Sequence, residues 1–316
     1  MSFTGSIKNI FKNPTVRKIE KAKDSDVLHS LKLGLALSGG GTHGVAYIGV
    51  FKAFEEAGIK FDYIAGTSIG SLMGALYSAG IPLSDIEYRA LNLKSKDIMT
   101  NKIPFMPSKP DKMIEQTRQA LEGKGFKDLK IPLTIVAVDI ISGEEVHITS
   151  GDLATAITAS CAVPAIFNPV TFGKYRLYDG GLRNNIPADV VREMGADIVI
   201  TVDVNPTRGY GTESEKYIDL MKAAFRILMK SNSVNGYIQS DYVLKIDLSK
   251  YASTKLKDVD EMMNIGYNVT KTQMPEILKA LGMRVPNEDV KETVKRLKMM
   301  KKRAKMLERE KKHVDE

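Results

Sequence analysis

The chain has 316 residues, of which 43% are hydrophobic and 27% are charged, as is typical of a globular protein rather than a disordered one. Its single cysteine, Cys161, excludes an intrachain disulfide and a cysteine-based metal cluster, which favours a reducing compartment. The formal net charge is +8, and residues 291–316 alone contain eleven Lys or Arg against five Asp or Glu. Most of the net positive charge therefore lies in a carboxyl-terminal tail and not in the main body of the chain.

No apolar run approaches the roughly 18 residues that a membrane-spanning helix needs. The first residues are basic and lack the apolar segment of a secretory signal. We therefore expect a cytoplasmic protein without a membrane anchor. The pattern predicts a basic segment at 1–30, a main domain at 31–250 and a helical extension with a basic amphipathic tail at 251–316.

Short apolar runs alternate with longer amphipathic stretches along the main domain. Strands are predicted at 33–38 and 61–66, each followed by a helix, and these helices end at Gly58 and Gly80. Further strands are expected at 133–139, 145–149, 197–202 and 242–246. This order favours the α/β class, with a largely parallel central sheet covered by helices on both faces.

The segments around 101–110 and after 258 are less regular. Prolines in "NKIPFMPSKP", residues 101–110, interrupt a helical stretch, and this loop fits either a mobile lip over a site or an ordinary loop packed on the body. After residue 258 the pattern is helical, and we expect Pro275 and Pro286 to interrupt it.

The stretch "LGLALSGGGTHGVAYIGV" contains a glycine loop that permits two interpretations. Gly39, Gly41 and Gly44 match the G-x-G-x-x-G spacing of a dinucleotide-binding turn between a strand and a helix. Such a fold places an acidic residue for the ribose at the carboxyl end of the second strand. Asp62 has suitable spacing but lies at the start of that strand, which weakens the interpretation as a nucleotide-dependent oxidoreductase.

The carboxyl end of the second predicted strand instead carries "GTSIG", residues 66–70. A G-x-S-x-G sequence between a strand and a helix is typical of a nucleophilic serine on a sharp turn, here Ser68. Carboxyl ends of neighbouring parallel strands meet at one edge of a sheet. We therefore expect the amides of Gly39, Gly40 and Gly41 to point at a carbonyl oxygen held over Ser68.

A serine nucleophile needs a base, and the chain has four histidines. His29 and His313 lie in polar terminal segments and are expected to be solvated. His43 is in the glycine loop, where its side chain is expected to face solvent. His147 could complete a catalytic triad in the α/β-hydrolase order Ser68, Asp139, His147. The pattern around it is nevertheless more typical of an ordinary strand side chain.

Asp179 is the stronger candidate for the base. It ends a short predicted strand and is followed by a glycine pair, a turn that can present a carboxylate over a pocket. An aspartate with a pKa of about 3.9 is a weak base at neutral pH unless burial raises that pKa.

Together, "GGGTHG", "GTSIG" and "DGG" in this order resemble the patatin-like phospholipase family. The resemblance covers about 33–247, including "SCAVPAIFNPV" and "GADIVITVDVN". It implies a three-layer α/β/α sandwich that acts as a serine acyl hydrolase on carboxyl esters of lipids, through an acyl-enzyme and without cofactor or metal. It also implies that Ser68 is the nucleophile, Asp179 the base, and Gly39, Gly40 and Gly41 the oxyanion donors.

His43 departs from the family pattern, because members usually have Arg or Lys there. Any preference for an anionic head group that depends on this side chain is therefore weakened. A catalytically silent lipid-binding or scaffold protein remains the main alternative function. The sequence does not indicate an oligomeric state.

The carboxyl-terminal tail has apolar residues at helical spacing with basic residues between them. Such a helix fits two arrangements equally: it lies transiently on an anionic membrane, or it docks on the body with a solvated charged face. Nucleic acid is not expected as a partner, because aromatic residues do not interleave the charges. The apolar positions are Val290, Val294, Leu297, Met300, Ala304 and Leu307.

Overall fold

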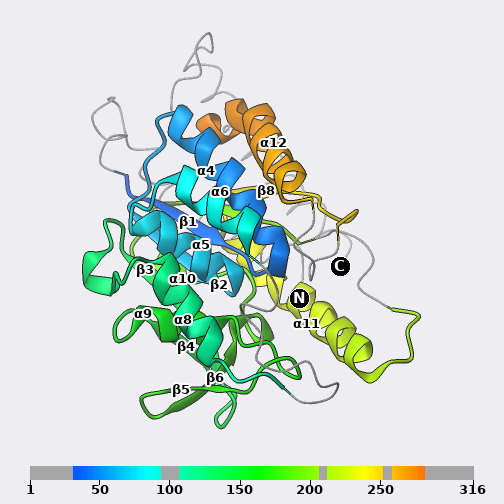
Figure 1. Ribbon diagram of the computed structural model, residues 1–316. Coiled ribbons are helices and arrows are strands. Elements are labelled where there is room, and N and C mark those ends of the chain that lie inside the picture. Colours follow the sequence, from blue (N-terminus) through cyan, green and yellow to red (C-terminus); the bar gives the residue numbers. More distant parts are fainter. Residues whose placement is uncertain (1–30, 94–106, 206–211, 252–257, 282–316) are drawn as a thin grey trace, which may run out of the picture. The chain divides into compact units, whose positions relative to one another are not determined.

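The structure, a computed structural model, describes residues 31–93, 107–205, 212–251 and 258–281 (Figure 1). Contacts between Cα atoms divide the chain into two compact units, one of which is Lys32–Gln273 and contains every strand described. The other comprises Met1–Leu31 and Met274–Glu316. The predicted basic tail lies outside the described residues, as does most of the predicted lip at 101–110.

A mixed sheet forms the centre of the larger unit, and in the described residues it has eight strands in the order β5-β6-β3-β2-β1-β7-β8, with β4 also paired to β3. The strands from β3 to β8 in this order are parallel to one another, whereas β4 and β6 pair with β3 in the antiparallel sense and β5 pairs antiparallel with β6. The parallel strands are β1 (Leu33–Leu37), β2 (Tyr63–Thr67), β3 (Leu133–Asp139), β7 (Ile198–Asp203) and β8 (Tyr242–Lys245). The strands joined by antiparallel pairing are β4 (Glu145–Ile148), β5 (Val170–Phe172) and β6 (Tyr175–Asp179).

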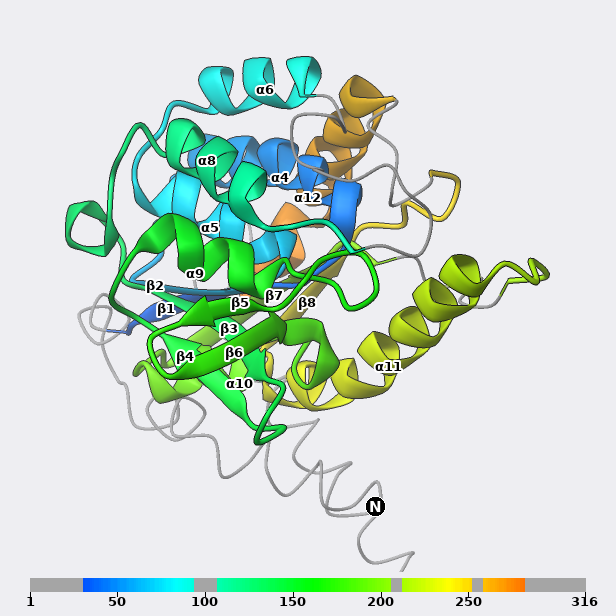
Figure 2. The same cartoon turned by 60° about the horizontal axis from the view of Figure 1, so that its bottom comes forward.

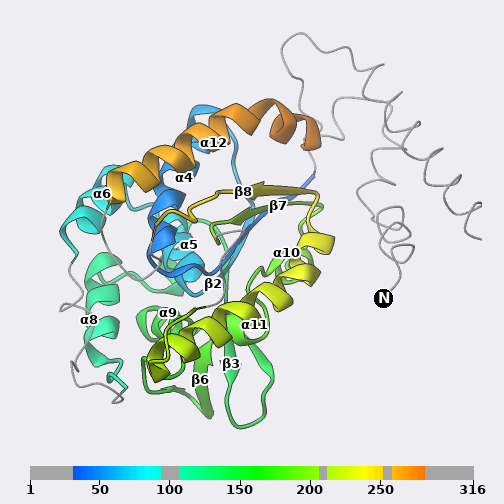
Figure 3. The same cartoon turned by 90° about the vertical axis from the view of Figure 1, so that its right-hand side faces the viewer.

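Helices cover both faces of this sheet, as Figures 2 and 3 show. Burial on both faces explains why β3 reads as an almost continuous apolar run with every residue buried. One face is covered by α4 (Ala46–Glu56), α5 (Ile69–Ser78) and α9 (Leu153–Ser160), with α6 (Leu83–Asn92) packed on α4 and α8 (Asp111–Ala120) on α9. The other face is covered by α10 (Ala188–Glu193) and α11 (Tyr217–Gln239).

Register brings the carboxyl ends of the central strands to one edge. Leu37, the last residue of β1, pairs with Gly66 of β2 on one side and with Val202 of β7 on the other. The loops that follow β1, β2 and β7 therefore leave the sheet side by side. This is the edge at which open α/β sheets bind their ligands.

The structure confirms the fold class and the predicted strands, including a short strand that ends at Asp179. One expectation was wrong: α12 (Val259–Ala280) continues through Pro275. A proline inside a helix removes one backbone donor but does not always end the helix. Among the described residues, no helix has the length and hydropathy to cross a membrane.

Candidate active site

Ser68 occupies a strained turn between β2 and α5. Its φ of 52° and ψ of −127° are rare for a residue other than glycine, and its side chain is buried. The glycines on either side let the backbone pass closely: a Cβ on Gly66 would lie 2.5 Å from the carbonyl carbon of Gly70, and a Cβ on Gly70 would lie 2.3 Å from the carbonyl oxygen of Leu37. The predicted G-x-S-x-G turn is thus present, and its glycines are sterically required.

Asp179 is brought to Ser68 by the pairing of β3. Val136 of β3 pairs with Thr67, and the next residue, Ala137, pairs with Asp179. The ends of β2 and β6 therefore lie together, although 111 residues separate Ser68 from Asp179. The Ser68 hydroxyl donates a hydrogen bond of 2.6 Å to Oδ2 of Asp179.

The Asp179 carboxyl group is 1% exposed, and this burial raises its pKa from 3.8 to about 7. The hydrogen bonds from the Ser68 hydroxyl and from the Gly181 amide, which reaches Oδ1 at 2.8 Å, act in the opposite direction. A carboxylate with a pKa near neutral is suited to take and return a proton at physiological pH. The burial that the sequence argument required is therefore present.

Neighbouring side chains hold the serine turn in place. The Ser160 hydroxyl accepts from the Ser68 amide at 2.8 Å and donates to the Val136 carbonyl at 2.6 Å. The Ser71 hydroxyl donates to the Ser68 carbonyl at 2.6 Å. Cys161, at the end of α9, lies within hydrogen-bonding reach of the Ser68 and Ser71 side chains, and its burial, followed by the charge of Asp179, raises its thiol pKa.

The glycine loop lies against Ser68 but its amides differ. The Gly39 amide donates to the Asn185 carbonyl at 3.2 Å, so it is already engaged. A Cβ on Gly39 would lie 3.2 Å from the Ser68 Cβ, which shows how closely the loop approaches. The amides of Gly40 and Gly41 have no acceptor among the described residues, and both glycines line the pocket that contains Ser68.

His43 is buried rather than solvated, contrary to the expectation from sequence. Its ring is 1% exposed and lies between two carbonyl oxygens, 3.2 Å from Val204 at Nδ1 and 3.0 Å from Tyr251 at Nε2. The 3₁₀ turn that follows the glycines, η1 (Gly41–Val45), directs the ring inward. Burial lowers the imidazole pKa, so His43 does not supply a fixed positive charge beside the loop.

The alternative order Ser68, Asp139, His147 is not assembled. The His147 Nε2 lies 2.7 Å from Oε1 of Glu145. The Asp139 carboxylate accepts from the Ser142 hydroxyl at 2.9 Å and from the Arg176 amide at 3.0 Å. Both side chains are thus engaged with groups other than Ser68.

Asp62 lies at the sheet edge opposite the glycine loop. Its carboxylate binds the Lys32 ammonium and the Leu33 amide, each at 2.8 Å, where β1 begins. A ribose held next to the glycine loop would be at the other end of these strands. The position of Asp62 therefore does not suit a dinucleotide.

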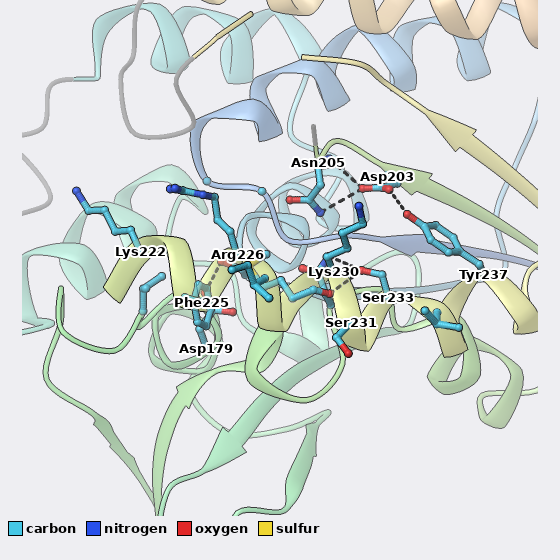
Figure 4. A pocket seen from close by; sticks show the side chains of 18 of the residues that line it. Asp179, Asp203, Asn205, Lys222, Phe225, Arg226, Lys230, Ser231, Ser233 and Tyr237 are labelled. Atoms are coloured by element: carbon cyan, nitrogen blue, oxygen red, sulfur yellow. Dashed lines mark hydrogen bonds between the residues drawn. The ribbon is translucent and has the colours of Figure 1, made fainter. Parts of the chain in front are cut away.

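A cavity of about 590 Å³ opens over Ser68 and Asp179 (Figure 4). Its lining combines apolar side chains such as Val163, Ile166 and Phe225 with several cationic ones. The Asn185 side chain also lines it, and its buried Oδ1 has no hydrogen-bond partner. Among the described residues, no group of three or more His, Cys, Asp or Glu side chains could hold a metal ion.

Sequence reasoning missed several parts of this pocket. The helix α11 supplies one wall, and the two residues that fix the loop and the turn, Asn185 and Ser160, were not identified either. The segment "DGGLRNNIP" contains Asn185 directly after the Asp179 motif, and this adjacency was the available signal.

Comparisons with known proteins find several relatives. An uncharacterized NTE family protein of Mycobacterium bovis is 32% identical over 180 residues, covering 56% of this chain and 50% of that protein. Patatin-like phospholipase domain-containing protein 6 of Homo sapiens is 34% identical over 205 residues, covering 62% of this chain and 15% of that protein. The chain thus spans half or less of the length of these relatives.

A solved structure shares the fold. The crystal structure of VipD from Legionella pneumophila superposes with a TM-score of 0.52 at 15% identity, over 80% of this chain and 67% of that one. At this identity the likeness concerns the fold alone.

The model of the patatin-like phospholipase family matches residues 35–192. The match contains the glycine loop, the Ser68 turn and the Asp179 turn in the order noted from the sequence. The chain belongs to the patatin-like phospholipase family.

Proposed function

We propose that this protein is a serine acyl hydrolase that cleaves carboxyl esters of lipids through a Ser68–Asp179 dyad. The observation that carries the proposal is the 2.6 Å hydrogen bond from the Ser68 hydroxyl to the buried Asp179 carboxylate. This pair faces a partly apolar cavity beside the glycine loop. Family membership and the phospholipase names of relatives support a lipid ester as substrate.

Acylation begins when Ser68 Oγ attacks the ester carbonyl carbon while Asp179 Oδ2 accepts the hydroxyl proton. The Gly40 and Gly41 amides donate to the oxyanion, and the Gly39 amide, through the Asn185 carbonyl, keeps the loop in place. When the carbon–oxygen bond to the alcohol breaks, the Asp179 carboxyl returns the proton to the leaving oxygen. An acyl-serine remains.

Deacylation repeats these steps with water. Water attacks the acyl carbonyl carbon as Asp179 accepts one of its protons, and the same amides hold the second oxyanion. Collapse of this intermediate releases the fatty acid and returns the proton to Ser68 Oγ. The pKa of about 7 at Asp179 lets it act in both directions near neutral pH.

Covalent labelling tests the proposal. We expect a fluorophosphonate to form one adduct, located at Ser68 by peptide mapping, and to label Asp179→Asn at least about a hundredfold more slowly because general-base assistance is lost. The exposed serine of α6, in Ser84→Ala, is the matched control and leaves labelling unchanged. An unlabelled wild-type protein with no ester turnover would overturn the proposal and favour a silent lipid-binding or scaffold protein.

The cytoplasmic location and the contact of the basic tail with an anionic membrane stay predictions. The tail lies outside the described residues.

A further inference from the structure

The helix α11 has most of its large aliphatic side chains on the outside. Large aliphatic side chains are exposed along it, for example Ile227 at 55% and Val234 at 57%. Among its described residues, the buried positions are Ala223, Met229, Ser233 and Gly236, of which Met229 alone has a long apolar side chain. A helix on the surface of a globular protein usually has the reverse arrangement, and large exposed apolar patches mark interaction sites. We call these exposed residues the outer face of α11: Leu220, Met221, Ile227, Leu228, Val234 and Ile238.

A row of cations flanks the outer face. Lys222, Arg226 and Lys230 follow one another at four-residue spacing, and Figure 4 shows their side chains on the same side of α11. We call them the basic row. Between residues 220 and 239 the chain has no Asp or Glu. Within the described part of the chain, Lys222 and Arg226 have no carboxylate partner.

The outer face and the basic row both reach the cavity over Ser68. Ile227 and Val234 of the outer face line this cavity, and so do all three cations of the basic row. A surface that covers α11 would therefore lie at the cavity entrance.

We propose that α11 is the helix by which the protein docks on an anionic phospholipid bilayer. The outer face enters the boundary between head groups and acyl chains, and the basic row binds lipid phosphates. Docking presents the cavity entrance to the bilayer, so the substrate is a lipid taken directly from the membrane. This last step rests on the proposed function, whereas the docking itself does not.

The charge of α11 favours a bilayer over a second copy of this chain as the partner that covers the outer face. A symmetric dimer through α11 would bring together two copies of a segment, residues 220–239, that has basic residues and no Asp or Glu, and like charges in contact are unfavourable. An anionic bilayer complements the basic row and accommodates the aliphatic side chains in the same contact.

Vesicle flotation of the full chain tests the docking. The Ser68→Ala background prevents hydrolysis, and the vesicles contain phosphatidylglycerol and phosphatidylcholine. Leu220→Gln with Leu228→Gln should lower the partition coefficient at least about tenfold, because two aliphatic anchors are lost. The matched control is Tyr88→Gln with Leu91→Gln, which removes comparably exposed side chains from α6 on the opposite layer and should change nothing.

A second pair of substitutions tests the contribution of the basic row to vesicle binding. Lys222→Gln with Arg226→Gln should weaken binding to the anionic vesicles about tenfold and leave binding to pure phosphatidylcholine vesicles unchanged. Vesicle binding that is the same with and without the α11 substitutions would overturn the proposal and point to another segment. A lipid-free dimer that dissociates on the Leu220 and Leu228 substitutions would also overturn it, because the outer face would then be a subunit interface.

Hydrolysis of a short, water-soluble ester separates this proposal from the proposed function. The Leu220 and Leu228 substitutions should leave this activity unchanged while vesicle-lipid hydrolysis falls with vesicle binding. A protein that binds vesicles through α11 but shows no ester turnover retains the docking proposal and refutes the hydrolase.

Discussion

Substitution of Asp179 by Asn should make the protein more stable at pH 8 while it abolishes most activity. In the folded protein the carboxyl group is buried and its pKa is about 7, whereas an ordinary aspartate has a pKa of 3.8. The folded state therefore binds this proton more tightly than the unfolded state does. Asparagine is nearly isosteric and has no charge to bury.

The sign and size of the effect follow from proton linkage. Between pH 4 and 7 the folded wild-type protein binds more protons than the unfolded chain, so the free energy of unfolding falls as pH rises through this window. At ~1.4 kcal/mol for each unit of pKa difference, the whole interval corresponds to about 4 kcal/mol. About 3 kcal/mol of it is expected between pH 5 and pH 8.

Urea unfolding of wild type and Asp179→Asn at several pH values measures this. Replacing a carboxylate oxygen by an amide group has a cost that does not vary with pH. The informative quantity is therefore how the difference in free energy of unfolding between Asp179→Asn and wild type changes with pH. This difference should grow with pH and level off above about pH 7. The exposed Asp85→Asn provides the matched control. A difference between wild type and Asp179→Asn that is flat from pH 5 to pH 8 would refute the reasoning.

Further predictions concern catalysis, packing and thiol chemistry. On a water-soluble ester, kcat/KM should rise about tenfold per pH unit below the Asp179 pKa and level off above about 7; a profile that falls instead would contradict a carboxylate base. Gly70→Ala should lower the free energy of unfolding by at least about 2 kcal/mol, because its Cβ would meet the Leu37 backbone, whereas Gly125→Ala, with its nearest contact at 3.8 Å, should change it little in a urea titration. Cys161 should react with iodoacetamide far more slowly than a free thiol at pH 8, because burial raises its pKa; rapid carboxymethylation by mass spectrometry would exclude this environment.

The local parts of the site were accessible from sequence. A sharp turn between a strand and a helix requires small flanking residues. The close backbone contacts of Gly66 and Gly70 explain why the G-x-S-x-G motif could be recognised in the sequence. The same holds for Asp179, whose carboxylate accepts from the Gly181 amide two residues later. Each of these features depends on neighbours within a few positions of the chain.

The remaining parts depend on contacts between distant residues. His43 is buried because carbonyls from Val204 and Tyr251 close around it, and neither is adjacent in sequence. The periodicity of α11 could not reveal its orientation either, since aliphatic spacing is the same whether the stripe faces the core or the outside. The raised pKa of Asp179 likewise follows from assembled burial, which no short motif contains.

These electrostatic features explain how the proposed dyad works without histidine. Before the reaction the negative charge resides on Asp179, and after proton transfer it resides on the substrate oxygen, so the pocket never acquires additional net charge. The burial that destabilises the Asp179 carboxylate in the resting protein is relieved at the step in which the carboxylate accepts a proton. The stability that Asp179→Asn should gain at high pH therefore has the same origin, burial of the carboxylate, as the proton affinity that the proposed dyad needs, and the two measurements should change together when burial around Asp179 is altered.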